Sequence, residues 1–130
     1  MKEKDFQVRF NKWCKYYVKK TSVFELKITQ TNSIPFAAVK EHQASALHIA
    51  KHSALVYKIP DAGYQNPFDS LIIRSADAYV VIMFYSRGEK IFYMIDIDDW
   101  IIEQKNSPRK SLTRERAASI GKICELKIKN

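Results

Sequence analysis

Glycine and cysteine are scarce in this sequence, and long apolar runs are missing from it. Only 3 of the 130 residues are glycine, so there is no glycine-rich loop of the kind that cradles a phosphate. The two cysteines, Cys14 and Cys124, form no CxxC motif and fit reduced thiols better than a disulfide framework. The longest apolar run, at residues 78–85, is too short to cross a bilayer, and the charged N-terminus lacks a signal-peptide core. We therefore expect a soluble, cytoplasmic protein with no membrane partner.

Basic residues are abundant. The chain has 22 lysines and arginines against 14 acidic residues, which gives a net charge of +8. A small domain with this balance is a candidate for a polyanionic partner, usually nucleic acid, although a basic protein without such a partner has the same composition. The hydrophobic content of 46% supports a real core. Because no low-complexity tract or boundary is visible, residues 1–130 are predicted to form one domain.

Two segments have the apolar spacing of amphipathic helices. The first covers residues 3–19, and its apolar stripe consists of Phe6, Phe10, Trp13 and Tyr17. The exposed side of this helix is basic through Arg9, Lys12, Lys15 and Lys19. The second covers residues 39–54, where Gln43 is the polar member of the inner stripe.

Alternating residues predict a strand at residues 23–29. Its apolar side carries Phe24, Leu26 and Ile28, and its other side carries Val23, Glu25, Lys27 and Thr29. The almost wholly apolar segment 78–85 is predicted to be a central strand, followed by a hairpin turn at residues 86–89. Further strands are expected at residues 55–59, 68–74, 90–97 and 123–129, and further helices at residues 98–104 and 112–120, the last capped by Gly121.

The tetrapeptide "FELK" places two opposite charges on one face of the strand at residues 23–29. Glu25 and Lys27 are two residues apart, so their side chains lie next to each other. A carboxylate can bind a hard divalent cation, and a neighbouring lysine can offset the charge that develops during phosphodiester cleavage. One carboxylate is a poor Mg²⁺ site, so a second must come from a neighbouring strand. The alternative is a solvated pair, which is how we interpret the second copy at Glu125 and Lys127.

The longer stretch "FELKITQTNSIPFAAVKEHQASAL" resembles the PD-(D/E)xK nucleases, most closely their Holliday junction resolvase branch. In that branch, a strand with E-x-K leads through a polar turn and a phenylalanine-bearing segment into a helix with His-Gln. Those places are filled here by Glu25 and Lys27, by Pro35 and Phe36, and by His42 and Gln43. The resemblance covers residues 6–97 and is strongest at residues 24–47. It implies an α/β fold with a restriction-endonuclease-like mixed β-sheet flanked by helices, and a metal-dependent endonuclease of DNA recombination.

The order of the acidic residues departs from that family. The family's aspartate precedes E-x-K on the adjoining strand, but no strand is predicted upstream of Glu25. Downstream, "YKIPDAGYQNPFDSLIIR" places Asp69 at the start of a strand that we expect beside residues 23–29, which is a circularly permuted order. Asp61, in the loop before it, is the rival ligand. The family's helix glutamate is replaced by Gln7, which can bind a metal-bound water but adds no charge.

The resemblance assigns a role to each site residue. Asp69, Glu25 and the backbone carbonyl of Leu26 would hold Mg²⁺ or Mn²⁺. Lys27 would position the attacking water and stabilise the developing charge, and Gln43 would orient part of the surrounding shell. Phosphates of branched or double-stranded DNA would contact the basic side chains of Arg9, Lys12, Lys15, Lys19 and Lys58.

Cutting two strands requires two sites, so a homodimer is expected, with the apolar hairpin strands and the C-terminal helix as candidate surfaces. The alternative function is a catalytically inactive basic DNA-binding or assembly protein that keeps the fold. A compact lone nuclease domain would suit a virus or a mobile element.

Two further clusters invite other interpretations. His48 and His52 have the i, i+4 spacing of zinc ligands, but no third ligand is evident, and a solvated role is favoured. Asp96, Asp98 and Asp99 follow a strand, where we expect them to cap the next helix.

Overall fold

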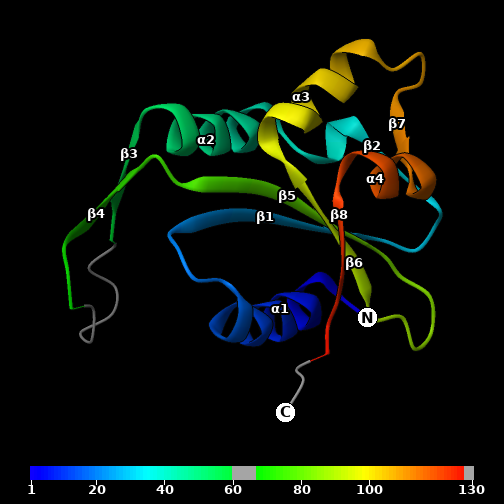
Figure 1. Ribbon diagram of the computed structural model, residues 1–130, viewed down its shortest axis with the longest axis horizontal. Helices are drawn as coiled ribbons and strands as arrows, with labels where there is room; N and C mark the ends of the chain where they lie inside the picture. The colour runs from blue at the N-terminus through cyan, green and yellow to red at the C-terminus, as the bar shows by residue number, and fades with distance from the viewer. Residues whose placement is uncertain (60–66, 128–130) are drawn as a thin grey trace.

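The computed structural model describes residues 1–59 and 67–127 and forms a mixed β-sheet flanked by helices (Figure 1). The predicted α/β class is therefore confirmed. The described elements, in chain order, are α1 (Glu3–Tyr17), β1 (Ser22–Thr29), β2 (Ser33–Pro35), the 3-10 helix η1 (Phe36–Ala38), α2 (Glu41–His52), β3 (Ala54–Lys58), β4 (Ser70–Arg74), β5 (Asp77–Phe84), β6 (Ile91–Asp96), α3 (Ile97–Asn106), β7 (Ser111–Thr113), α4 (Arg114–Ile120) and β8 (Lys122–Glu125).

The main sheet has the strand order β1-β5-β6-β8. Strand β1 runs parallel to β5, whereas the β5–β6 and β6–β8 pairs are antiparallel. Two smaller antiparallel pairs, β2–β7 and β3–β4, lie outside this sheet. The apolar strand β5 is central, as predicted, and β1 and β8 are the two edges of the sheet.

Helices cover both faces of the main sheet. Figure 1 shows α1 alone on one face and α2, α3 and α4 on the other. Strand β5 serves both layers, because Val80 and Ile82 join the core under α2, while Val81 and Met83 join the core over α1. None of these four side chains is exposed to solvent. An apolar strand without alternation is what burial on both faces requires.

A hairpin interrupts the connection between the two parallel strands. The chain runs from β1 through α2, which packs on the sheet, and then makes the β3–β4 hairpin before it returns as β5. Figure 1 shows the hairpin projecting from the body of the molecule. At its base the Ala76 N–H donates to the Ala50 carbonyl at 3.0 Å, and Ser75 bends the chain with a φ of 53°.

Several predicted boundaries shift by a few residues. The first helix ends at Tyr17, so Lys19 lies beyond it, and the first two residues of the helix predicted at 112–120 belong instead to strand β7. Gly121 follows α4 with a φ of −117°, so this position does not require glycine for a left-handed backbone conformation. A Cβ there would lie 2.8 Å from Ile95 Cγ1, and close packing of the turn against β6 requires the glycine. Most of the loop that contains Asp61 lies outside the described residues.

The apolar hairpin strands proposed as a dimer surface, β5 and β6, are buried in the centre of the sheet. Because helices cover both faces of these strands, they offer no free surface, and that part of the dimer prediction is wrong. None of the helices in the described parts of the chain is long and apolar enough to span a membrane.

Candidate functional site

The charged side chains of "FELK" lie together on β1. Lys27 Nζ is 3.2 Å from Glu25 Oε1, and 16% of the lysine side chain and 27% of the glutamate side chain are exposed. Phe24, Leu26 and Ile28 pack into the core on the α1 face, whereas Val23 packs into the core on the α2 face. Because side chains alternate along a strand, Glu25 and Lys27 share the α2 face with Val23, as the sequence predicts.

Helix α2 packs on the same face of β1 and carries Gln43 in its first turn. Gln43 is half-buried, and its Oε1 accepts a hydrogen bond from the Lys40 N–H at 3.0 Å. This is the reciprocal half of a capping box, which satisfies a backbone donor at the start of the helix. The oxygen of Gln43 therefore has a structural partner, and its amide nitrogen is left to donate elsewhere.

The backbone of Leu26 points toward the open edge of the sheet. The carbonyls of Thr21 and Thr29 both accept hydrogen bonds from the β5 side, from Asp77 and Tyr85. Backbone direction alternates with a period of two along a strand, so odd-numbered residues of β1 face β5 and even-numbered ones face away from it. The Leu26 carbonyl is thus placed where it could bind a ligand, next to Glu25.

A shallow hollow of about 380 Å³ lies against this part of β1. It is lined by Glu3, Lys4, Gln7, Phe24, Glu25 and Leu26. Gln7 therefore lines the same hollow as Glu25, although α1 packs on the face of the sheet opposite to the Glu25 side chain. Glu3, one turn earlier on α1, adds a carboxylate that the sequence analysis missed. Its i, i+4 spacing from Gln7 on one helix face was the available signal.

Asp69 lies elsewhere. The strand that follows it, β4, pairs with β3 and not with β1, and the neighbour of β1 is β5. The expectation that the Asp69 strand lies beside residues 23–29 is therefore wrong within one chain. Strand pairing between distant segments is decided by tertiary packing, which local periodicity does not report. The rival Asp61 lies outside the described residues.

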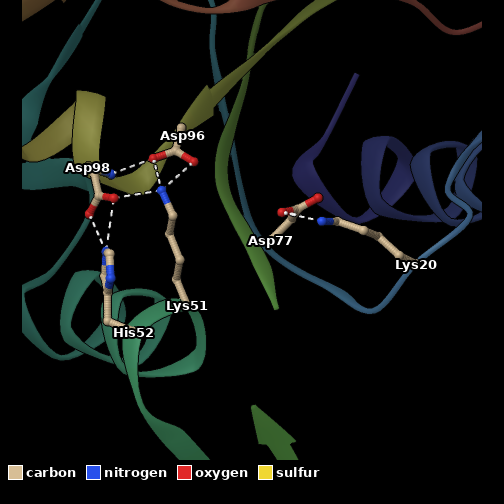
Figure 2. Close-up of polar contacts among 6 residues, drawn as sticks. All are labelled: Lys20, Lys51, His52, Asp77, Asp96 and Asp98. Atoms are coloured by element: carbon tan, nitrogen blue, oxygen red, sulfur yellow. Dashed lines mark hydrogen bonds and ion pairs between the residues drawn. The ribbon is translucent and has the colours of Figure 1, made fainter. Parts of the chain in front are cut away.

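No acidic residue of β5 takes the place of Asp69 beside Glu25. Asp77 begins β5, but its partner across the strands is Ser22. The Asp77 carboxylate forms an ion pair with Lys20 Nζ at 3.1 Å (Figure 2). Asp77 also shares a strand face with Tyr79, which packs in the α1 layer, so its carboxylate and that of Glu25 belong to opposite faces of the sheet.

The predicted DNA-contacting residues are all exposed. Arg9, Lys12 and Lys15 are on α1, Lys19 follows that helix, and Lys58 ends β3 in the hairpin. Figure 1 shows α1 on the opposite face of the sheet from α2, and Glu25 and Lys27 lie on the α2 face. One nucleic acid could contact both groups only by passing around the open edge of β1.

A second charged cluster joins α2 to the start of α3. Lys51 Nζ lies 2.9 Å from both carboxylate oxygens of Asp96 and 2.6 Å from Asp98 Oδ2, and His52 Nε2 is 2.9 Å from Asp98 (Figure 2). Asp96 also caps α3 by accepting from the Asp98 N–H at 2.8 Å, as predicted for this acidic group. Hydrogen bonds from Lys51 and then from His52 lower the pKa of Asp98 against the opposing effect of burial. The same bonds, to Asp98 first and then to Asp96, raise the pKa of Lys51.

This cluster also supplies the third group that the histidine pair lacked in the sequence. Within the described ranges, His48, His52 and Asp98 have potential ligand atoms within 4.8 Å of one another. The Asp98 carboxylate contacts the Lys51 ammonium as the Glu25 carboxylate contacts that of Lys27, so a metal ion at either carboxylate would compete with a resident cation. No local pattern could have predicted this contact, because it depends on how α2 packs against α3.

Comparisons with known proteins identify no relative of this chain. No protein-family model, no curated protein and no solved structure matches the chain.

Proposed function

We propose that this protein is a Mg²⁺- or Mn²⁺-dependent endodeoxyribonuclease that hydrolyses phosphodiester bonds in branched or double-stranded DNA. The observation that carries the proposal is the half-buried Glu25–Lys27 pair, 3.2 Å apart on an edge strand beneath α2. The partial burial of this pair distinguishes it from a fully solvated pair on an exposed strand. The net charge of +8 suits a polyanionic substrate.

The donor atoms are of the type that a hard cation prefers. The Glu25 carboxylate and the Leu26 carbonyl would hold the ion, and water would complete its coordination. When bound, the ion would lower the pKa of a coordinated water and polarise the scissile phosphate. Lys27 would orient the attacking water and offset negative charge on the phosphate, and the amide nitrogen of Gln43 would donate to this arrangement.

A catalytically inactive DNA-binding or assembly protein is the second candidate. Two observations favour it: Gln7 carries no charge, and Asp69 is absent from the strand beside β1. In that case the basic surface would bind DNA, with an affinity that falls with salt, and no strand would be cut.

The test is Mg²⁺-dependent cleavage of a four-way junction and of linear duplex, with the wild type and Lys27→Ala. We expect the wild type to cut and the variant to retain DNA binding while losing at least about 10²-fold in rate. Equal cleavage by both proteins would overturn the assignment. Binding without cleavage by both would favour the second candidate.

A further inference from the structure

The β3–β4 hairpin exposes an unusual amount of apolar surface. Among the described residues, five of the twelve exposed large hydrophobic side chains belong to it or directly precede β4: Val56, Tyr57, Phe68, Leu71 and Ile72. Val56 is opposite Ile72 on one face, and Tyr57 is opposite Leu71 on the other. Both faces of the ribbon are therefore apolar and open.

A ribbon of this kind needs a partner. A two-stranded hairpin alone is marginally stable in water, and its unpaired edges are templates for another strand. Within the described chain, β3 and β4 hydrogen-bond only to each other. Exposed apolar side chains that cluster in this way are typical of a surface that contacts another protein.

The open edge of β1 has no strand paired with it among the described residues, which complements the unpartnered hairpin. Among the residues that the structure describes, β1 pairs only with β5, and the backbone groups of Phe24, Leu26 and Ile28 face the other, open side. Glu25 on this strand needs a second carboxylate to hold a divalent ion, and Asp69 stands at the start of the exposed β4. The open edge of β1 lacks a neighbouring strand and a second carboxylate, and the β3–β4 hairpin could supply both.

We propose that the β3–β4 hairpin of a second copy of this chain adds to the open edge of β1 and brings its Asp69 to Glu25 and Lys27. The catalytic site is then shared between two chains, and this inference rests on the proposed nuclease function. Two-fold symmetry makes the exchange reciprocal, because each copy donates one hairpin and receives one. The dimer gains two equivalent sites, one for each DNA strand. Strand addition supplies affinity through backbone hydrogen bonds, and the apolar side chains supply the buried area.

The test uses mixed dimers made by co-expressing two differently tagged variants and purifying through both tags. In a dimer of Asp69→Asn with Glu25→Gln, a shared arrangement leaves one site fully intact, so we expect about half of the wild-type cleavage. If each site belongs to one chain, both sites are damaged and no activity returns. The matched control is a dimer of Glu25→Gln with Lys27→Ala. These residues lie on the same strand, so neither site is intact and no cleavage is expected.

Mn²⁺ binding by calorimetry separates this inference from the proposed function. If the wild type cuts DNA but the Asp69→Asn/Glu25→Gln dimer neither cuts nor binds Mn²⁺, the shared site is overturned and the nuclease function stands. If the wild type does not cut, yet this mixed dimer binds half as many ions as the wild type, the shared site stands and the nuclease function falls.

A second variant tests the proposed interface while leaving the residues of the proposed metal site unchanged. Val56→Asp combined with Ile72→Asp places charges on one face of the hairpin, and we expect sedimentation to change from dimer to monomer. Circular dichroism should remain native, because neither side chain belongs to the core. A wild type that sediments as a monomer would overturn the proposal.

Discussion

The same tripeptide, Glu-Leu-Lys, occurs within edge strand β1 and at the end of edge strand β8, and the surroundings of the two copies differ. Glu25 and Lys27 on β1 are half-buried, paired and covered by α2. Glu125 ends β8 and is exposed, and Lys127 lies exposed beyond the strand. A motif of three residues therefore carries little information, whereas the element packed over it decides whether its charges are available for chemistry.

The largest expected difference between the copies is in catalysis. Glu25→Gln should lower the rate of Mg²⁺-dependent DNA cleavage by roughly 10²-fold or more, because it removes the carboxylate that would hold the ion. The matched variant Glu125→Gln should leave the rate unchanged. A nicking assay at saturating Mg²⁺ measures both, and a loss of equal size in the two variants would remove the distinction between the strands.

The next largest effect concerns α2, the helix that packs on β1 over the first copy of the tripeptide. Leu47 on α2 is 5% exposed, and Leu47→Ala should lower the free energy of unfolding by about 2–5 kcal/mol through the cavity it leaves. Ile49→Ala, on the exposed side of the same helix, should cost far less. Urea unfolding followed by circular dichroism checks the pair. Comparable losses would mean that α2 does not pack as described.

A smaller effect concerns the charged cluster that fastens α2 to α3. Lys51→Met should cost about 1 kcal/mol in unfolding free energy at neutral pH, since the group is partly exposed. Lys105→Met, an exposed lysine on α3, is the control and should cost almost nothing.

The same cluster makes stability depend on pH at the acid end. The pKa of Asp98 lies below its ordinary value of 3.8 in the folded protein, so its contribution is complete above that value. It is lost as the pH falls through the lower, folded pKa. The Lys51 contribution has the opposite sign, being complete below its ordinary pKa of 10.5 and lost only at more alkaline pH. Urea unfolding at pH 6 and at decreasing acid pH should show a shallower acid loss in Asp98→Asn than in the wild type. Parallel curves would contradict this assignment.

A last effect, of similar size, separates the capping role of Gln43 from its proposed role in catalysis. Gln43→Ala removes the cap on the Lys40 N–H and should cost about 1 kcal/mol in unfolding free energy. Gln43→Glu keeps an acceptor for that bond, so stability should be retained, while the amide donor is lost. If Gln43→Glu also retains full cleavage activity with an unchanged pH profile, Gln43 acts only as a cap.

Local patterns predicted most of the fold. The stripe of Phe6, Phe10 and Trp13 identified α1, and the uninterrupted apolar run identified β5 as central, because both depend on residues close in sequence. The pairing of Glu25 with Lys27 also followed from spacing alone. The partner of β4, the approach of Asp98 to the histidines, and the tight packing at Gly121 could not be predicted. Each depends on contacts between segments far apart in the chain.

The hydrogen bond between Ala76 and Ala50 brings the two ends of the hairpin to the same point of the body. The polypeptide leaves the globule and rejoins it at neighbouring positions, so beyond the base that packs on α2 the length of the hairpin does not set the position of β5. Lengthening, shortening or replacing this arm would leave the alignment of β5 against β1 intact. The arm can therefore change to suit what it reaches while the globule that carries it stays the same.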